Sequence, residues 1–162
     1  EMCIRDRPFF AHHPAATLPT IERPGARIHL LIGRLLGASS PVAMHSDTLY
    51  CAVELDADAQ VSIPPEHAER AVYVVYGRVS IDGEPVEAGQ LAVLAASGTV
   101  ELTTRRPARV MLLGGAPLGP RFVWWNFVSS RAERIERAKA DWAAQRLGPI
   151  EGETEFIPLP ER

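Results

Sequence analysis

The sequence predicts a mainly β domain, either a sandwich or a small barrel, followed by one α-helix and an extended tail. Three observations support this: short β-branched runs between residues 27 and 114, turn residues between these runs, and one helical repeat near the C-terminus. Eight runs have the composition of strands: RIHLLI, LYCAVEL, AQVSI, AVYVVYG, RVSI, LAVL, TVELT and RVMLLG. Because no helical segment separates them, a sandwich or a small barrel is expected.

Alternation along these runs predicts which side chains face the core. In residues 27–32, Ile28, Leu30 and Ile32 fall on one face of the strand. The dipeptide Asp82–Gly83 follows RVSI, and both residue types tolerate the positive φ angles of a tight hairpin. A hairpin is therefore expected at this dipeptide.

Residues 130–148 form the one convincing helical segment of the sequence. Ser130 and Glu133 have the spacing of a capping box, and Arg137 and Asp141 can pair one turn apart. Gly148 is expected to end the helix. An apolar stripe, which would pack the helix on its neighbours, runs through Ala132, Ile135, Ala138 and Trp142.

Composition along the chain predicts four parts. Residues 1–7 share no pattern with the rest and are interpreted as foreign sequence, and the proline-rich residues 8–25 as an interdomain linker or arm. The barrel is expected over residues 26–120. Residues 121–162 should contain the helix and tail, packed on the barrel or on another domain.

The overall charge argues against two classes of partner. Lys and Arg number 17 against 20 Asp and Glu, a net charge of −3, which does not favour direct nucleic-acid binding. No apolar run reaches the roughly 18 to 20 residues of a membrane helix. The two cysteines form neither a zinc motif nor a disulfide framework, so a cytoplasmic setting is expected.

Several segments together resemble the pirin family. They are HHPAATLP, SPVAMHSDTLYCAVEL, HAERAVYVVYGRVSIDG, LLGGAPLG, WWNFVSSRAERIERAKADW and EFIPLPE. Members of this family are bicupins, with an N-terminal and a C-terminal β-barrel. The resemblance covers residues 8–162 and corresponds to the linker and the C-terminal barrel only. It implies a cupin-type β-barrel, a jelly roll also described as a double-stranded β-helix.

The resemblance also implies that the two barrels differ in function. In this family the Fe(II) site belongs to the N-terminal barrel, and some bacterial members are credited with quercetin 2,3-dioxygenase activity on flavonoid-like substrates. The present chain is then expected to be metal-free and inert by itself, with the N-terminal cupin as its partner. The alternative is a non-enzymatic binding or regulatory module that resembles a transcription co-regulator.

Register along one motif tests whether this barrel has kept a metal site. In metal-bearing cupins a glutamate lies four residues before the aromatic residue of the strand end, and two histidines lie four and six residues before that glutamate. Aligning Tyr73 on that aromatic residue places Glu69 on the glutamate, and Ile63 and Pro65 on the histidines. Glu101 falls on the histidine of the second cupin motif. An iron site with two imidazoles is therefore not expected.

The polar residues near this motif remain candidates for ligand contact at the barrel mouth. They are His45, His67, Glu69 and Glu101. His67 and Glu69 are interpreted as rim residues that could bond to each other. Two further alternatives stay open: His67 as a metal ligand in a shifted register, and Glu69 with Glu101 as an acid–base pair. The aromatic residues 124–127 are expected to anchor the helix on the barrel wall.

Overall fold

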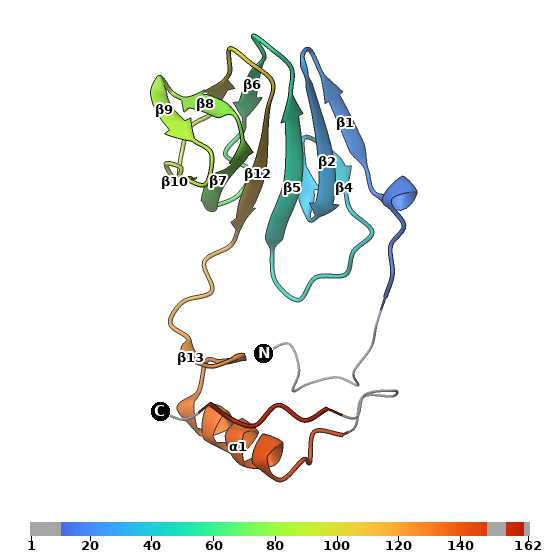
Figure 1. The fold of residues 1–162 in the computed structure, drawn as a ribbon, viewed down its shortest axis with the longest axis vertical. Helices are drawn as coiled ribbons and strands as arrows, with labels where there is room; N and C mark the ends of the chain where they lie inside the picture. The colour runs from blue at the N-terminus through green and yellow to red at the C-terminus, as the bar shows by residue number, and fades with distance from the viewer. Residues whose placement is uncertain (1–10, 149–154, 161–162) are drawn as a thin grey trace. The chain divides into compact units, whose positions relative to one another are not determined.

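Antiparallel strands in two sheets build residues 20–115 of the computed structural model, which describes residues 11–148 and 155–160 (Figure 1). The six-stranded sheet has the order β1 (Thr20–Arg23), β2 (Ala26–Ile32), β5 (Thr48–Leu55), β12 (Ala108–Gly115), β7 (Glu69–Tyr76) and β10 (Leu91–Val93). The four-stranded sheet has the order β6 (Gln60–Ile63), β11 (Val100–Thr103), β8 (Arg78–Ile81) and β9 (Glu84–Glu87). A short hairpin of β3 (Arg34–Leu35) and β4 (Ala38–Ser39) accompanies them.

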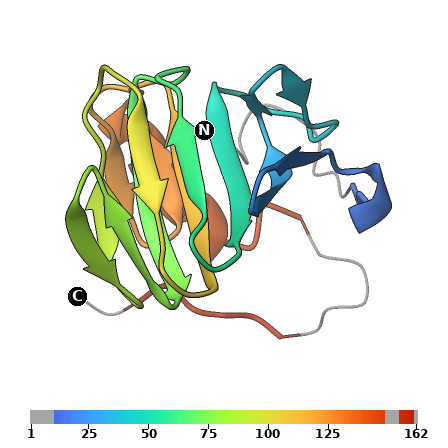
Figure 2. The same ribbon diagram turned by 90° about the horizontal axis from the view of Figure 1, so that it is seen from above.

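The core lies on the inner faces of these strands, as alternation predicts. Its most buried members include Ile28, Leu30, Leu49, Val53, Val72, Val74, Leu102, Val110 and Leu112. In both Figure 1 and Figure 2 the β8–β9 hairpin and the β1–β2 pair lie at opposite sides of this domain. The predicted turn is present: Asp82 and Gly83 join β8 to β9 with φ angles of 49° and 93°.

The segment expected to be an arm, residues 8–25, contains a strand. Thr20–Arg23 pairs along its whole length with β2, with Thr20 opposite His29 and Ile21 opposite Ile28. Only the one-turn 3₁₀ helix at Ala15–Thr17 precedes it in the described chain. The sheet therefore begins earlier in the sequence than predicted, because Ile21 adds a buried side chain to the core. The expected foreign segment, residues 1–7, lies outside the described residues, as do residues 8–10 of the expected linker.

The chain divides into two compact units between Pro117 and Leu118, three residues before the predicted boundary. The C-terminal unit contains the hairpin of β13 (Phe122–Trp124) and β14 (Phe127–Ser129), the helix α1 (Ala132–Ala143) and the tail segment 155–160. The predicted pair is present, with Arg137 Nε 3.6 Å from Asp141 Oδ2.

The ends of α1 differ from the prediction. Arg131 occupies the N-cap position without a side-chain capping bond, one residue after the predicted cap Ser130. The helix ends at Ala143, and Gln145 adopts a positive φ of 53° before Gly148 is reached. No helix in the described part of the chain is long and apolar enough to cross a membrane.

Aromatic side chains hold the C-terminal unit together. Trp125 packs edge-on against Trp142 of α1, with ring centroids 5.3 Å apart, and Trp142 stacks on Phe156 of the tail at 5.7 Å. The indole Nε1 of Trp142 also donates a 2.8 Å hydrogen bond to the carbonyl of Ile157. Residues 124–127 thus pack on one another and on Trp142 of the helix of their own unit. The expected anchoring of the helix on the barrel wall stays a prediction.

Candidate functional site

The barrel end near the start of β7 is the place where the sequence predicts a site. Strand register brings Glu69 opposite Gly115, and Gly115 opposite Thr48, so the loop before β5 lies at the same end. Gly114 allows a close approach there, because a Cβ atom at this position would lie 2.8 Å from the Glu69 carbonyl and 3.4 Å from His67 Cβ. The glycine pair of LLGG therefore belongs to strand β12 and supports this end of the barrel.

The inward-facing residue of β7 at this end is Arg70, one position after the predicted Glu69. Along the strand, Arg70, Val72 and Val74 are buried, whereas Glu69 and Tyr73 are exposed. Successive side chains of a strand point to opposite faces, so Glu69 cannot point into the core when Arg70 does. The alignment of Glu69 with an inward glutamate ligand is therefore wrong by one residue.

The Arg70 side chain is 3% exposed and bonds to backbone carbonyls of two loops. Its Nη1 donates to the carbonyls of Ile63 and Pro64 at 3.3 and 2.9 Å. Its Nη2 donates to those of Ala95 and Gly98 at 2.6 and 3.0 Å. The Nε atom is buried without a hydrogen-bond partner among the described residues, so the four carbonyl bonds must offset its desolvation.

His67 is buried, 5% exposed, and does not bond to Glu69. Its Nδ1 lies 3.1 Å from Asp47 Oδ2 and its Nε2 lies 2.9 Å from the carbonyl of Arg34. A carbonyl oxygen only accepts, so Nε2 is the donor in the hydrogen bond to the Arg34 carbonyl. Because both ring nitrogens are engaged, His67 has no nitrogen free for a metal; it ties the β3–β4 hairpin to the loop before β5.

The other two candidates lie on different surfaces. His45 is exposed in the loop before β5. Glu101 lies on the outer face of the four-stranded sheet, where its carboxylate accepts hydrogen bonds from Ser62 and Gln60. The buried neighbours Val100 and Leu102 face inward instead. Glu101 and Glu69 therefore do not share one cavity as an acid–base pair.

These residues do not fit an iron site. Iron(II) in oxygenases prefers two imidazoles and a carboxylate on one face. In the described residues, no three His, Cys, Asp or Glu side chains gather closely enough to hold a metal ion. The inward position of β7 carries a guanidinium, and the nearest histidine has both nitrogens engaged. Sequence reasoning missed Arg70, although an arginine directly before the apolar run AVYVV could have drawn attention to it.

Comparisons with known proteins agree with this architecture. A quercetin 2,3-dioxygenase from Acinetobacter baumannii has a similar solved structure, with a TM-score of 0.78 and 27% identity over 90% of this chain and 50% of that chain. A pirin-like protein of Caulobacter vibrioides is 46% identical over 156 residues. A Pseudomonas aeruginosa protein, whose name gives quercetin 2,3-dioxygenase as a provisional activity, is 35% identical over 154 residues.

The chain spans about half the length of these curated relatives, 54% of the first and 48% of the second. The expected mainly β cupin fold is confirmed by the solved structure and by the family profile. That profile, described as the Pirin C-terminal cupin domain, matches residues 50–148, which is more than half of the chain. The chain therefore belongs to the pirin family, as its C-terminal cupin domain.

Proposed function

We propose that this domain is the metal-free, non-catalytic barrel of a pirin-like protein. Its intact form would be an Fe(II)-dependent oxidoreductase similar to quercetin 2,3-dioxygenase. The relatives' names support the activity, and their double length leaves room for a second, metal-bearing barrel. The observation that carries the proposal for this domain is the Arg70 guanidinium, which takes the inward position of β7.

Electrostatics explain why this guanidinium and a metal exclude each other. A +1 and a +2 charge about 4 Å apart repel by roughly 8 kcal/mol at an effective dielectric constant of about 20. The four carbonyl oxygens that surround the guanidinium already satisfy it, so no carboxylate is needed there. An arginine in this position stabilises the loops of the barrel mouth, and it occupies the place where a side chain that binds iron would have to point inward.

The outer face of the six-stranded sheet supports a scaffold role. Tyr73 lies opposite Leu91 on one side and Met111 on the other. Leu91 and Val93 are 57% and 80% exposed at the sheet edge. The solvated face of an antiparallel sheet usually carries polar side chains, so these exposed apolar residues favour an interface on this face. We propose that the second barrel of the longer protein covers this face.

Iron content tests the proposal. The purified chain is incubated anaerobically with ferrous iron, desalted, and analysed by plasma mass spectrometry, and quercetin consumption is followed in air. We expect substoichiometric iron and no turnover. The Caulobacter relative, 46% identical and about twice as long, serves as the positive control and is expected to retain iron and consume quercetin.

Two outcomes would change the interpretation. One equivalent of iron in the present chain, lost in a His67→Ala or His45→Ala variant, would refute the metal-free barrel. Iron without quercetin turnover in the longer relative would favour the regulatory alternative over the enzyme.

Docking on the outer sheet face is tested in a separate experiment. The other half of the relative, expressed alone, should bind this chain, and Val93→Asp should weaken that binding.

A further inference from the structure

A groove of about 960 Å³ lies at the barrel end opposite Arg70. Register places Tyr76, the last residue of β7, opposite Arg109 at the start of β12, whereas Glu69 lies opposite Gly115 at its end. The groove is bounded by the segment 58–60, by the strands β8 and β9, and by the loop 104–107. Its volume lies in the range of small-molecule binding sites.

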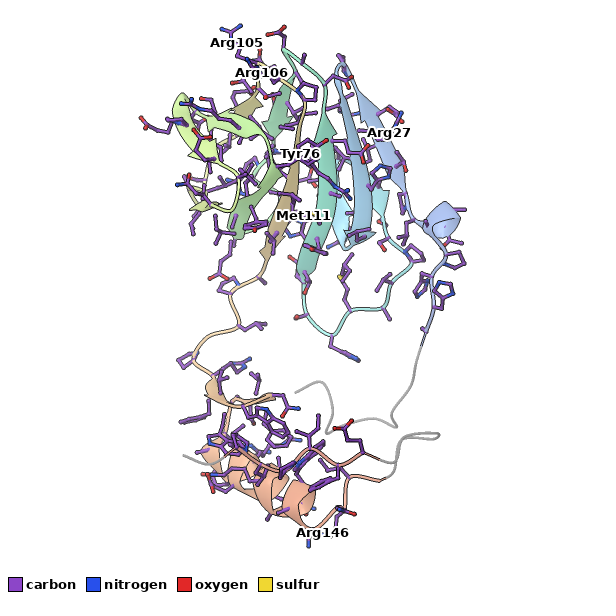
Figure 3. The ribbon with its side chains drawn as sticks, in the orientation of Figure 1. Arg27, Tyr76, Arg105, Arg106, Met111 and Arg146 are labelled. Atoms are coloured by element: carbon purple, nitrogen blue, oxygen red, sulfur yellow. The ribbon has the colours of Figure 1, made fainter. Side chains whose placement is uncertain are left out.

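Three arginines line this groove: Arg78, Arg105 and Arg106. Figure 3 labels Arg105 and Arg106 close together at this end of the domain, whereas Arg27 lies on the sheet that contains β1 and β2. Two carboxylates, Asp58 and Glu87, also line the groove. Three guanidinium groups against two carboxylates leave one positive charge uncompensated, in a chain whose net charge is −3.

A buried threonine holds two of these arginine backbones in place. Thr104 is 5% exposed, and its hydroxyl oxygen lies 2.9 Å from the carbonyl of Arg78 and 2.6 Å from that of Arg106. The Thr104 amide donates at 3.1 Å to the carbonyl of Ala59. One residue thus joins the three segments that bound the groove, so the backbones that carry Arg78 and Arg106 are fixed before any ligand arrives.

The guanidinium groups remain available to a ligand. Arg78 pairs with Glu87 at 3.0 Å, but both side chains are more than half exposed. Arg105 lies 3.6 Å from Asp58, with both side chains still more exposed. Exposed pairs of this kind contribute little and exchange readily. Among the described residues, the Arg106 guanidinium has no hydrogen-bond or ion-pair partner, so its five donors face the groove or the solvent.

We propose that this groove binds a small organic anion that carries phosphate or carboxylate groups. Guanidinium groups bind such oxyanions with two parallel hydrogen bonds, a geometry that suits planar recognition better than a lysine would. Pro85 and Pro107, both exposed, supply apolar wall for the body of the ligand. The site is independent of the barrel mouth at Arg70, so its test does not depend on the metal-free scaffold proposed above.

The test uses calorimetric titration of the purified chain with inorganic pyrophosphate in one arm and citrate in the other, at constant ionic strength. Amide chemical shifts locate the site. We expect at least one of the two anions to bind and to shift the amides of Arg78, Thr104 and Arg106. Arg106→Ala should weaken the binding about tenfold, the loss expected for a charged hydrogen bond. The control variant Arg27→Ala removes an exposed arginine on the other sheet and should leave the affinity unchanged.

The outcomes separate the alternatives. Binding of pyrophosphate but not citrate identifies a phosphorylated ligand, and binding of citrate but not pyrophosphate identifies a polycarboxylate. Equal binding of both anions indicates that the site selects its ligand by charge and geometry only. Each supports the site, provided that Arg106→Ala weakens it. Absence of binding by both anions at millimolar concentration would overturn the proposal, as would equal weakening by Arg27→Ala. Circular dichroism of each variant excludes unfolding as the cause of a loss.

Discussion

Replacing Arg70 with methionine tests the central feature of the barrel mouth. Methionine keeps the length and most of the apolar volume of the side chain but removes all five donors. Four backbone carbonyls then lose the hydrogen bond that Arg70 donates, two where β6 ends at Ile63 and Pro64, and two in the loop that contains Ala95 and Gly98. The variant should fold, because the surrounding core of Val72 and Val74 remains.

The expected loss of stability is the balance of two effects. Four unsatisfied carbonyls at about 1 kcal/mol each cost about 4 kcal/mol. The substitution also removes a buried charged group, and the Nε atom of that group has no hydrogen-bond partner in the described structure. Its removal offsets the loss of stability by about 1 kcal/mol. The net decrease in the free energy of unfolding is therefore about 3 kcal/mol. For a domain of this size that corresponds to a decrease in Tm of roughly 6 to 12 °C.

Urea and thermal unfolding, followed by circular dichroism, measure the change. The matched control is Arg109→Met, the same substitution on the exposed face of the neighbouring strand β12, for which a change within about 0.5 kcal/mol is expected. Amide exchange should also become faster in residues 95–98. If Arg70→Met is as stable as the wild type or more so, the carbonyl cage does not stabilise the barrel and the reasoning fails.

Three other residues allow independent tests. His67→Ala should lower the free energy of unfolding by about 2 kcal/mol, because it removes the donor to the Arg34 carbonyl and the ring nitrogen 3.1 Å from the Asp47 carboxylate, whereas His45→Ala should have no effect; equal effects would contradict this. Burial raises the pKa of the Cys51 thiol to about 12 from 9.0, so it should resist iodoacetamide at pH 8, as peptide mass spectrometry can show. As the pH rises, the Cys51 thiol loses its proton at a lower pH in the unfolded chain than in the folded chain. The contribution of Cys51 to stability is therefore complete below pH 9 and declines as the pH rises from about 9 to about 12. If the difference in stability between the wild type and Cys51→Ala stays constant over this range, the predicted pH dependence is refuted. Trp142→Phe removes the donor to the Ile157 carbonyl, so proteinase K should release the C-terminal tail faster, and an unchanged rate would show that stacking alone holds it.

The strands could be predicted because alternation and β-branched residues report burial directly. LYCAVEL and RVMLLG lie in the central pair β5 and β12, where the alternate residues Cys51, Val53, Val110 and Leu112 are buried. Strand β1 was missed because TIER has one apolar residue between two prolines, and only pairing with β2 makes it a strand. The helix ends were misplaced for a similar reason: Gln145 takes a positive φ that sequence rules assign to Gly148.

The site could be predicted only in part. In RAVYVVY both faces of the strand carry apolar residues, so the pattern does not reveal whether Glu69 or Arg70 points inward. The sequence does show that one histidine cannot supply two imidazoles near this motif, which already disfavours an iron site. It does not show that His67 is buried between Asp47 and Arg34, because those partners lie 20 and 33 residues away.

By itself, the sequence of this protein determined the mainly β class, the hairpin at Asp82–Gly83 and the resemblance to pirins, because these depend on local periodicity and on short motifs. Only the tertiary structure decided what stands at the barrel mouth. The carbonyls of Ala95 and Gly98 that hold Arg70 lie 25 and 28 residues from it along the chain. A carbonyl is present at every residue, so its place around a buried charge arises only when distant loops meet in the folded chain.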